Sequence, residues 1–175
     1  LGLVGSEMCI RDSFVIGMDS SGQMIVTGGK GRTLIVYDRS GNVLWSRYLD
    51  HVIIAGGVSA NGDIAVGTVG GVVYYFKPDG TLSFRRTQGG VCYNGVYITR
   101  NGKYVLVGGP NPTLLDANGT VLWQLNPQRE LTPRRLGDLD SVNTVYLSED
   151  ASLIVLGYNN GTVQFWRLTG TKPPE

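Results

Sequence analysis

Residues Asp38–Trp45 read DRSGNVLW and residues Asp116–Trp123 read DANGTVLW, so both stretches fit the pattern D-x-x-G-x-x-L-W. A third copy, KPDGTLSF at Lys77–Phe84, lies midway between them, with Lys in place of the Asp and Phe in place of the Trp. The glycines of successive copies are 39 residues apart. A fixed period of this length indicates a repeat architecture in which each unit is one supersecondary structure.

A second row of turn residues keeps nearly the same period. It comprises Ser21-Gly22, Asn61-Gly62 and Asn101-Gly102, and Asp150-Ala151 is a fourth member that an insertion displaces. Thr169-Gly170 is the fourth member of the first row. A large apolar side chain stands four residues before the glycine of each member of that row: Tyr37, Phe76, Leu115 and Trp166. These landmarks stay in register over four copies, which predicts four structural units.

The second unit shows what each copy contains. Its apolar segments are Val52–Ser59, Asp63–Thr68, Val72–Phe76 and Thr81–Arg85, and Asn61-Gly62, Gly70-Gly71 and Pro78-Asp79-Gly80 separate them. Asn-Gly favours a tight hairpin because both residues tolerate positive φ. Four antiparallel strands in about 40 residues make one blade of a β-propeller. We therefore expect an all-β fold, a partial β-propeller of about four blades of four-stranded antiparallel sheet, with the fourth blade incomplete after Trp166.

The D-x-x-G-x-x-L-W copies resemble the blade motif of the pyrroloquinoline-quinone-like (PQQ-like, quinoprotein-like) propellers. GTVQFW at Gly161–Trp166 is closer to WD40-like repeats. The quinoprotein-like resemblance implies that the Trp on the outer strand of one blade docks onto the next blade. We accordingly expect Trp45 and Trp123 to pack between blades. The alternative is that either side chain is an exposed platform that stacks on sugars.

The repeat predicts a propeller region at residues 14–170, with blades at about 14–50, 51–90, 91–130 and 141–170, a loop insertion at 126–140, and a linker or truncated end at 171–175. Closed propellers have about four to eight blades. Quinoprotein-like rings typically carry seven or eight by family resemblance, so we expect a fragment of a longer protein whose remaining blades complete the ring. The alternative, a closed four-bladed ring, requires residues 1–13 to supply the missing outer strand.

Residues 1–13 lie outside the repeat. Leu3–Ser13, LVGSEMCIRDS, resembles the translation of one reading frame of a transposase-type sequencing adapter. We therefore expect a non-native segment, with the natural chain beginning near Phe14. This segment contains Cys9, so the disulfide with Cys92 that the sequence allows on paper would not belong to the natural protein. Cys92 is instead expected to be an unpaired core cysteine.

Composition limits the range of partners. The chain has 15 basic and 14 acidic residues and a net charge of +1, which is no electrostatic footprint for nucleic acid. Its longest mostly apolar run, Ile64–Phe76, is shorter than the ~18 residues of a spanning helix, and Gly70-Gly71 interrupts it. We expect no nucleic-acid partner and no membrane span in this segment.

Motifs that carry chemistry are scarce. The only histidine, His51, stands at a blade junction without a partner pattern, as a surface or turn residue does. The GGKG stretch at Gly28–Gly31 lacks the spacing of a phosphate-binding loop, and the Asn-Gly and Asp-Gly pairs do not form a calcium loop. The resemblance implies that a quinone cofactor would need calcium, carboxylates and, in many members, a vicinal disulfide, but the chain has no adjacent cysteines. We predict no enzyme activity, no catalytic or metal-ligating residue and no cofactor.

One irregular segment, NPQRELTPRRLGDLD, occupies residues 126–140. We expect a solvated surface loop. The alternative is a partner-binding loop in which Arg129, Arg134 and Arg135 meet an acidic partner, because loops on rigid scaffolds often carry recognition. The leading hypothesis is a non-catalytic propeller segment that serves as a protein- or ligand-binding scaffold within a larger protein, in an extracytoplasmic or cell-envelope location. The alternatives are a fragment of a PQQ-dependent dehydrogenase and a fragment of an envelope assembly factor with quinoprotein-like blades.

Overall fold

The computed structural model describes residues 13–88, 95–125, 142–158 and 160–169, and every regular element within them is a β-strand. The first sheet contains β1 (Ser13–Met18), β2 (Met24–Gly29), β3 (Thr33–Asp38) and β4 (Val43–Tyr48). The second contains β5 (Ile53–Val58), β6 (Ile64–Thr68), β7 (Val72–Phe76) and β8 (Leu82–Thr87). The third contains β9 (Val96–Ile98), β10 (Tyr104–Val107), β11 (Thr113–Asp116) and β12 (Val121–Gln124). The fourth contains β13 (Val142–Leu147), β14 (Leu153–Tyr158) and β15 (Val163–Arg167).

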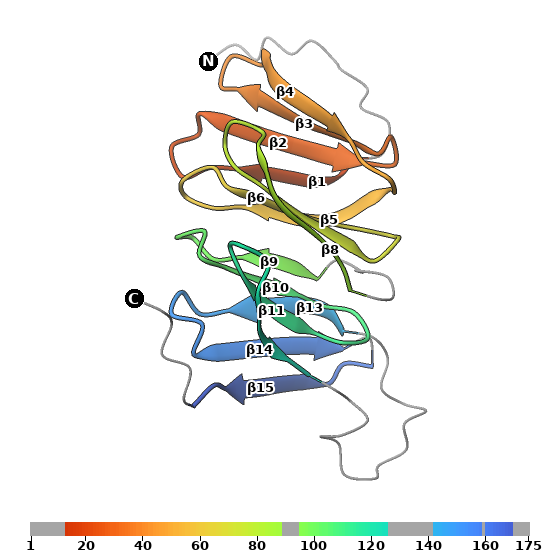
Figure 1. The fold of residues 1–175 in the computed structure, drawn as a ribbon, viewed down its shortest axis with the longest axis vertical. Helices are drawn as coiled ribbons and strands as arrows, with labels where there is room; N and C mark the ends of the chain where they lie inside the picture. The colour runs from red at the N-terminus through yellow and green to blue at the C-terminus, as the bar shows by residue number, and fades with distance from the viewer. Residues whose placement is uncertain (1–12, 89–94, 126–141, 159, 170–175) are drawn as a thin grey trace.

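Each sheet is an antiparallel meander in which strands adjacent in sequence pair with one another. Within the described ranges, three sheets have four strands and the fourth has three, which confirms the predicted partial β-propeller with an incomplete last blade. The four sheets follow one another along the long axis of the molecule (Figure 1), and the first strands β1, β5, β9 and β13 form a row of neighbours. We call these four the inner strands, and call β4, β8 and β12 the outer strands.

The core consists of three apolar layers, one between each pair of neighbouring sheets. A sheet is stable only when its apolar face is covered, so each blade depends on its neighbours for burial. The second blade has neighbours on both sides, and every residue of β6 and β7 is buried. Burial on two faces explains why these strands read as continuous apolar runs and do not alternate between apolar and polar residues.

The D-x-x-G motif builds the turn between the third and fourth strands of a blade. In the first blade the Asp38 carboxylate accepts hydrogen bonds from the backbone N–H groups of Ser40 and Asn42, both at 2.8 Å. Gly41 then takes a left-handed φ of 85°, which glycine adopts without steric cost. The second blade has Lys77 at the Asp position, and Asp79 accepts from the backbone N–H of Thr81 at 2.9 Å instead. The turn geometry therefore survives the loss of the motif aspartate.

Two non-glycine residues occupy left-handed turn positions. Arg32 has a φ of 59° at the turn between β2 and β3, where the second blade has Gly71. Ala151 has a φ of 56° at the turn between β13 and β14, where the earlier blades have Gly22, Gly62 and Gly102. The left-handed region costs such residues about 1–2 kcal/mol. Both are therefore strained versions of a turn that the repeat otherwise builds with glycine.

The predicted adapter-derived segment at residues 1–13 lies outside the described residues except for Ser13, the first residue of β1. The predicted insertion at 126–140, the predicted end at 171–175, Cys9 and Cys92 also lie outside them. The residue limits of the four blades remain a prediction.

Candidate functional site

The outer strand of the first blade carries an aromatic side chain that docks onto the second blade. Trp45 is half-buried, its Nε1–H donates to the carbonyl oxygen of Pro78 at 2.8 Å, and its ring centroid lies 5.8 Å from that of Phe76. Gly80 lies against the indole, and a Cβ at this position would stand 2.9 Å from it. Arg47 donates from Nη2 to the carbonyl oxygen of Gly80 at 3.3 Å. These contacts confirm that Trp45 packs between blades.

The joint between the second and third blades repeats this arrangement with different residues. Phe84 lies against Gly119, where a Cβ would stand 2.8 Å from its ring, and Arg86 donates to the carbonyl oxygen of Gly119 at 3.3 Å. Phenylalanine has no N–H group. The neighbouring Ser83 Oγ donates instead, to the carbonyl oxygen of Ala117 at 2.9 Å, which is the position that Pro78 holds in the second blade. The hydrogen bond across the joint is therefore kept by a different side chain.

The joint between the third and fourth blades pairs two indoles. The ring centroids of Trp123 and Trp166 are 5.9 Å apart, and both residues belong to the apolar layer between these blades. Trp123 thus also packs between blades, as predicted. At Gly41 of the first blade the corresponding position is exposed, and a Cβ there would meet none of the described residues within 4 Å. The outward face of the first blade therefore presents the receiving half of a joint.

A polar cluster joins the second and third blades. The buried Tyr75 hydroxyl donates to the carbonyl oxygen of Gly102 at 2.6 Å, and Lys77 Nζ forms an ion pair with Asp63 at 3.1 Å. Burial, and then the nearby Asp63 carboxylate, raise the pKa of Tyr75 above its usual range. The phenol therefore stays protonated at physiological pH, and the cluster is a structural tie between blades.

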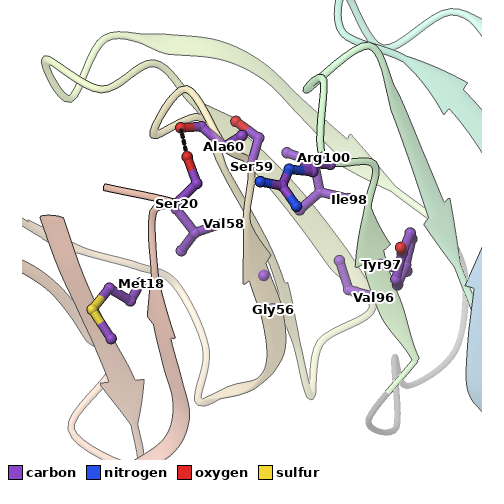
Figure 2. A pocket seen from close by; sticks show the side chains of 11 residues that line it. Met18, Ser20, Gly56, Val58, Ser59, Ala60, Val96, Tyr97, Ile98 and Arg100 are labelled. Atoms are coloured by element: carbon purple, nitrogen blue, oxygen red, sulfur yellow. Dashed lines mark hydrogen bonds between the residues drawn. The ribbon is translucent and has the colours of Figure 1, made fainter. Parts of the chain in front are cut away.

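A groove with a volume of about 560 Å³ runs along the inner strands of the first three blades (Figure 2). It is lined by the consecutive residues Gly56, Gly57, Val58, Ser59 and Ala60, by Val96, Tyr97, Ile98 and Arg100, and by Met18 and Ser20. Successive side chains of a strand point to opposite faces. A groove lined by consecutive residues of a strand therefore follows the edge of that strand, not one of its faces.

The walls of the groove are fixed by contacts between turns. The Ser20 hydroxyl donates to the carbonyl oxygen of Ala60 at 3.1 Å, as the dashed line in Figure 2 shows, and the backbone N–H of Ala60 donates to the carbonyl oxygen of Arg100 at 2.7 Å. The Glu149 carboxylate accepts from the backbone N–H groups of Arg100 (2.6 Å) and Asn101 (3.1 Å). This series ties four blades together at one end of the groove.

Tyrosines replace glycines along the inner strands as the chain proceeds. Gly17 and Gly57 hold the same register position in the first two blades, and a Cβ on Gly57 would stand 3.1 Å from Ile98. Tyr97 and Tyr146 hold this position in the third and fourth blades, with ring centroids 5.0 Å apart. Burial raises the pKa of Tyr97, with smaller contributions from Tyr146 and Glu149. Tyr97 is therefore a neutral aromatic side chain that packs between the third and fourth blades.

The structure places some of the sequence-predicted residues and leaves others outside its description. Arg129, Arg134 and Arg135 lie outside the described residues, so the predicted partner-binding loop stays a prediction. His51 is exposed, and its ring packs against Gly70 in the second blade. Within the described ranges, no group of three His, Cys, Asp or Glu side chains is arranged to hold a metal ion. No helix that could cross a membrane is found among the same residues.

The groove itself was not anticipated from the sequence. Its floor consists of glycines that look like turn residues in a chain with 26 glycines. The residue that could have indicated the groove from the sequence is Gly56, because the corresponding positions of the other blades are Ile16, Val96 and Val145. A glycine that interrupts an apolar strand position often marks close approach by another group.

Comparison with known proteins supports the fold. No family model and no curated protein matches the chain. It is similar to the solved structure of the computationally designed Ika4 protein, with a TM-score of 0.74 and 16% identity over 94% of this chain and 96% of that one. It is also similar to BamB from Moraxella catarrhalis, with a TM-score of 0.68 and 19% identity over 90% of this chain. The chain spans 47% of the BamB chain. At these identities the likeness shows a β-propeller-like fold and nothing finer.

Proposed function

We propose that this chain is a non-catalytic section of a β-propeller that acts as a binding scaffold for a protein or small ligand within a larger protein. The observation that carries the proposal is the groove of about 560 Å³ along the inner strands. Its volume lies within the roughly 300–1,000 Å³ that is usual for ligand sites. Three buried apolar layers hold its walls, so the site is largely formed before any ligand arrives.

The outward face of the first blade supports a role inside a larger ring. Tyr48 and Met18 are 72% and 58% exposed there, and no described residue supplies Gly41 with the aromatic neighbour that Gly80 and Gly119 have. At the other end, Phe165 is 70% exposed on β15. Exposed apolar side chains at both ends fit contacts with the remaining blades of a parent chain.

Two further functions compete with this proposal. The likeness to BamB, together with the quinoprotein-like motif, favours a fragment of an envelope assembly factor and an extracytoplasmic or cell-envelope location. The same motif at Asp38–Trp45 keeps a PQQ-dependent dehydrogenase as a candidate. The dehydrogenase alternative predicts that the chain reduces an artificial dye when it is supplied with PQQ, calcium and an alcohol. The scaffold proposal predicts no dye reduction above the rate without protein.

The binding role can be tested by NMR on the isotope-labelled chain, titrated with a set of small polar and aromatic compounds. We expect shift changes to concentrate on the backbone amides of residues 56–60 and 96–98. The amides of the exposed turn at residues 30–32 serve as an internal control. Shift changes that scatter over the surface, or that avoid the groove, would contradict the proposal.

A further inference from the structure

The groove exposes the free edge of a β-strand. β5 is the edge strand of its sheet and pairs only with β6 among the described strands. Ser59 donates its backbone N–H to the carbonyl oxygen of Asp63 at 2.8 Å, so this residue faces the ladder. Backbone groups alternate in direction along an antiparallel strand. The N–H and C=O groups of Gly56 and Val58 therefore point away from β6, toward the groove.

Glycine keeps this edge accessible. Gly56 is the only member of its register position without a side chain, because the other blades carry Ile16, Val96 and Val145 there. Gly57 follows directly, but the third blade covers its Cβ position, which lies 3.1 Å from Ile98, so Gly56 is the position at which this edge carries no side chain. Exposed strand edges pair readily with extended chains unless side chains, charges or bulges block them. The part of the groove wall that β5 forms can thus pair with an additional strand.

The charge of the residues that line the groove favours a partner with a negatively charged group. Among the described residues that line the groove, Arg100 is the only charged one, and it is exposed. Figure 2 shows its guanidinium turned toward Ser59, at one end of the exposed edge. The carboxylate of nearby Glu149 accepts hydrogen bonds from backbone N–H groups. A partner that placed a carboxylate at this end of β5 would gain a charge-assisted hydrogen bond from the guanidinium.

We propose that the groove binds an extended peptide segment that pairs as an added strand with the free edge of β5 and places an acidic side chain against Arg100. This inference rests on the proposed function and specifies the partner of the same site. Main-chain hydrogen bonds to Gly56 and Val58 supply sequence-tolerant affinity, as in other strand-addition complexes. Val96 and Ile98, which line the groove from the third blade, contact the apolar residues that flank the acidic one.

The test uses the full chain and three fluorescent acetylated pentapeptides. TVEVT combines strand-forming residues with one acidic side chain. TVKVT reverses the charge, and TPEPT keeps the charge but removes two backbone donors. We expect saturable binding of TVEVT in a polarisation assay, with TVKVT and TPEPT each at least about tenfold weaker. Amide hydrogen exchange at Gly56 and Val58 slows when TVEVT is bound.

Variants of the chain localise the contact. Arg100→Gln is expected to weaken TVEVT by about tenfold, whereas Arg39→Gln, on an exposed turn of the first blade, leaves binding unchanged. Gly56→Val installs the side chain that the third and fourth blades carry and is expected to abolish binding. Gly31→Val, at an exposed turn position with nothing within 4 Å of its Cβ, is the matched control. Circular-dichroism melts establish that all four variants are folded.

Several outcomes overturn the peptide proposal: no binding of TVEVT to the folded chain, equal binding of TVEVT and TVKVT, or equal binding of TVEVT and TPEPT. An effect of Arg100→Gln no larger than that of Arg39→Gln does so as well. If peptides fail while small compounds still shift the amides of residues 56–60, the peptide class is wrong and the scaffold proposal survives. If neither probe perturbs the groove, both proposals fail.

Discussion

Removing the indole at the first blade joint should measure how much one docked aromatic contributes to the fold. Trp45→Ala withdraws about half of a ~200 Å² side chain from its contacts. At about 25 cal/mol per Å², that loss corresponds to roughly 2.5 kcal/mol. The hydrogen bond from Nε1–H to Pro78, at 2.8 Å, adds about 0.5–1 kcal/mol. We expect Trp45→Ala to lower the free energy of unfolding by about 3 kcal/mol, measured by urea denaturation with far-UV circular dichroism.

The second joint supplies a control for the hydrogen bond alone. Trp45→Phe keeps an aromatic ring on Gly80 but removes the donor, so we expect a loss of about 1 kcal/mol. Leu44 holds the position that Ser83 holds in the next blade, and it is 51% exposed. Leu44→Ser should therefore recover most of that loss in the Trp45→Phe background and recover nothing in the wild type. Equal effects of Leu44→Ser in both backgrounds, or a Trp45→Phe loss as large as that of Trp45→Ala, would refute this account of the joint.

Four further substitutions test the turns. Gly80→Ala and Gly41→Ala place a methyl group at φ values of 83° and 85°, and each should cost about 1–2 kcal/mol in backbone strain. Only Gly80→Ala also displaces Trp45, so it should lower the melting temperature more than Gly41→Ala does. Equal melting temperatures of the two variants would contradict the docking geometry. Ala151→Gly relieves a left-handed φ of 56° and should raise the free energy of unfolding by about 0.5–1 kcal/mol, and a lower melting temperature would count against strain at this turn. Hydrogen bonds from Ser148 and Ser152 lower the pKa of Asp150 to about 2, below the ~3.9 of an unfolded chain, so its stabilising effect is complete above about pH 4 and is lost as the pH falls through the folded value. The stability difference between wild type and Asp150→Asn should therefore shrink between about pH 4 and about pH 2, and a constant difference would show that the carboxylate is not stabilised in this way.

Much of the fold could be predicted because its determinants are local and periodic. The Gly-containing turns and the apolar runs between them identify strands one by one, and the predicted segment Val72–Phe76 coincides with β7. The expected Asn61-Gly62 hairpin is also present, but only Gly62 takes a positive φ, because the turn spans Ser59 to Asp63. The local pattern therefore determines where the chain turns, and the hydrogen bonds between the strands determine which residues of the turn take a positive φ.

The groove could not be predicted in the same way, because it depends on what three separate blades place side by side. Gly56 and Arg100 are more than 40 residues apart and meet only after the blades stack. Nothing in a single-blade pattern distinguishes a glycine that opens a strand edge from a glycine that makes a turn. The distinction needs the register, which assigns Gly56 to a strand position that carries Val96 and Val145 in other blades.

The blade joints and the inner edge respond differently to changes of sequence. At the joints, Phe84 with Ser83 replaces the indole of Trp45, yet the ring still meets a glycine and the hydrogen bond still crosses to the next blade. Packing imposes that result, since each blade is stable only when its neighbour covers it. At the inner edge, by contrast, the step from Gly57 to Tyr97 replaces a bare position beside Ile98 with a ring that packs on Tyr146. Because stacking does not require that change, the inner edge is where a repeat scaffold is free to acquire a ligand, and Gly56 is a position at which this chain departs from its own repeat.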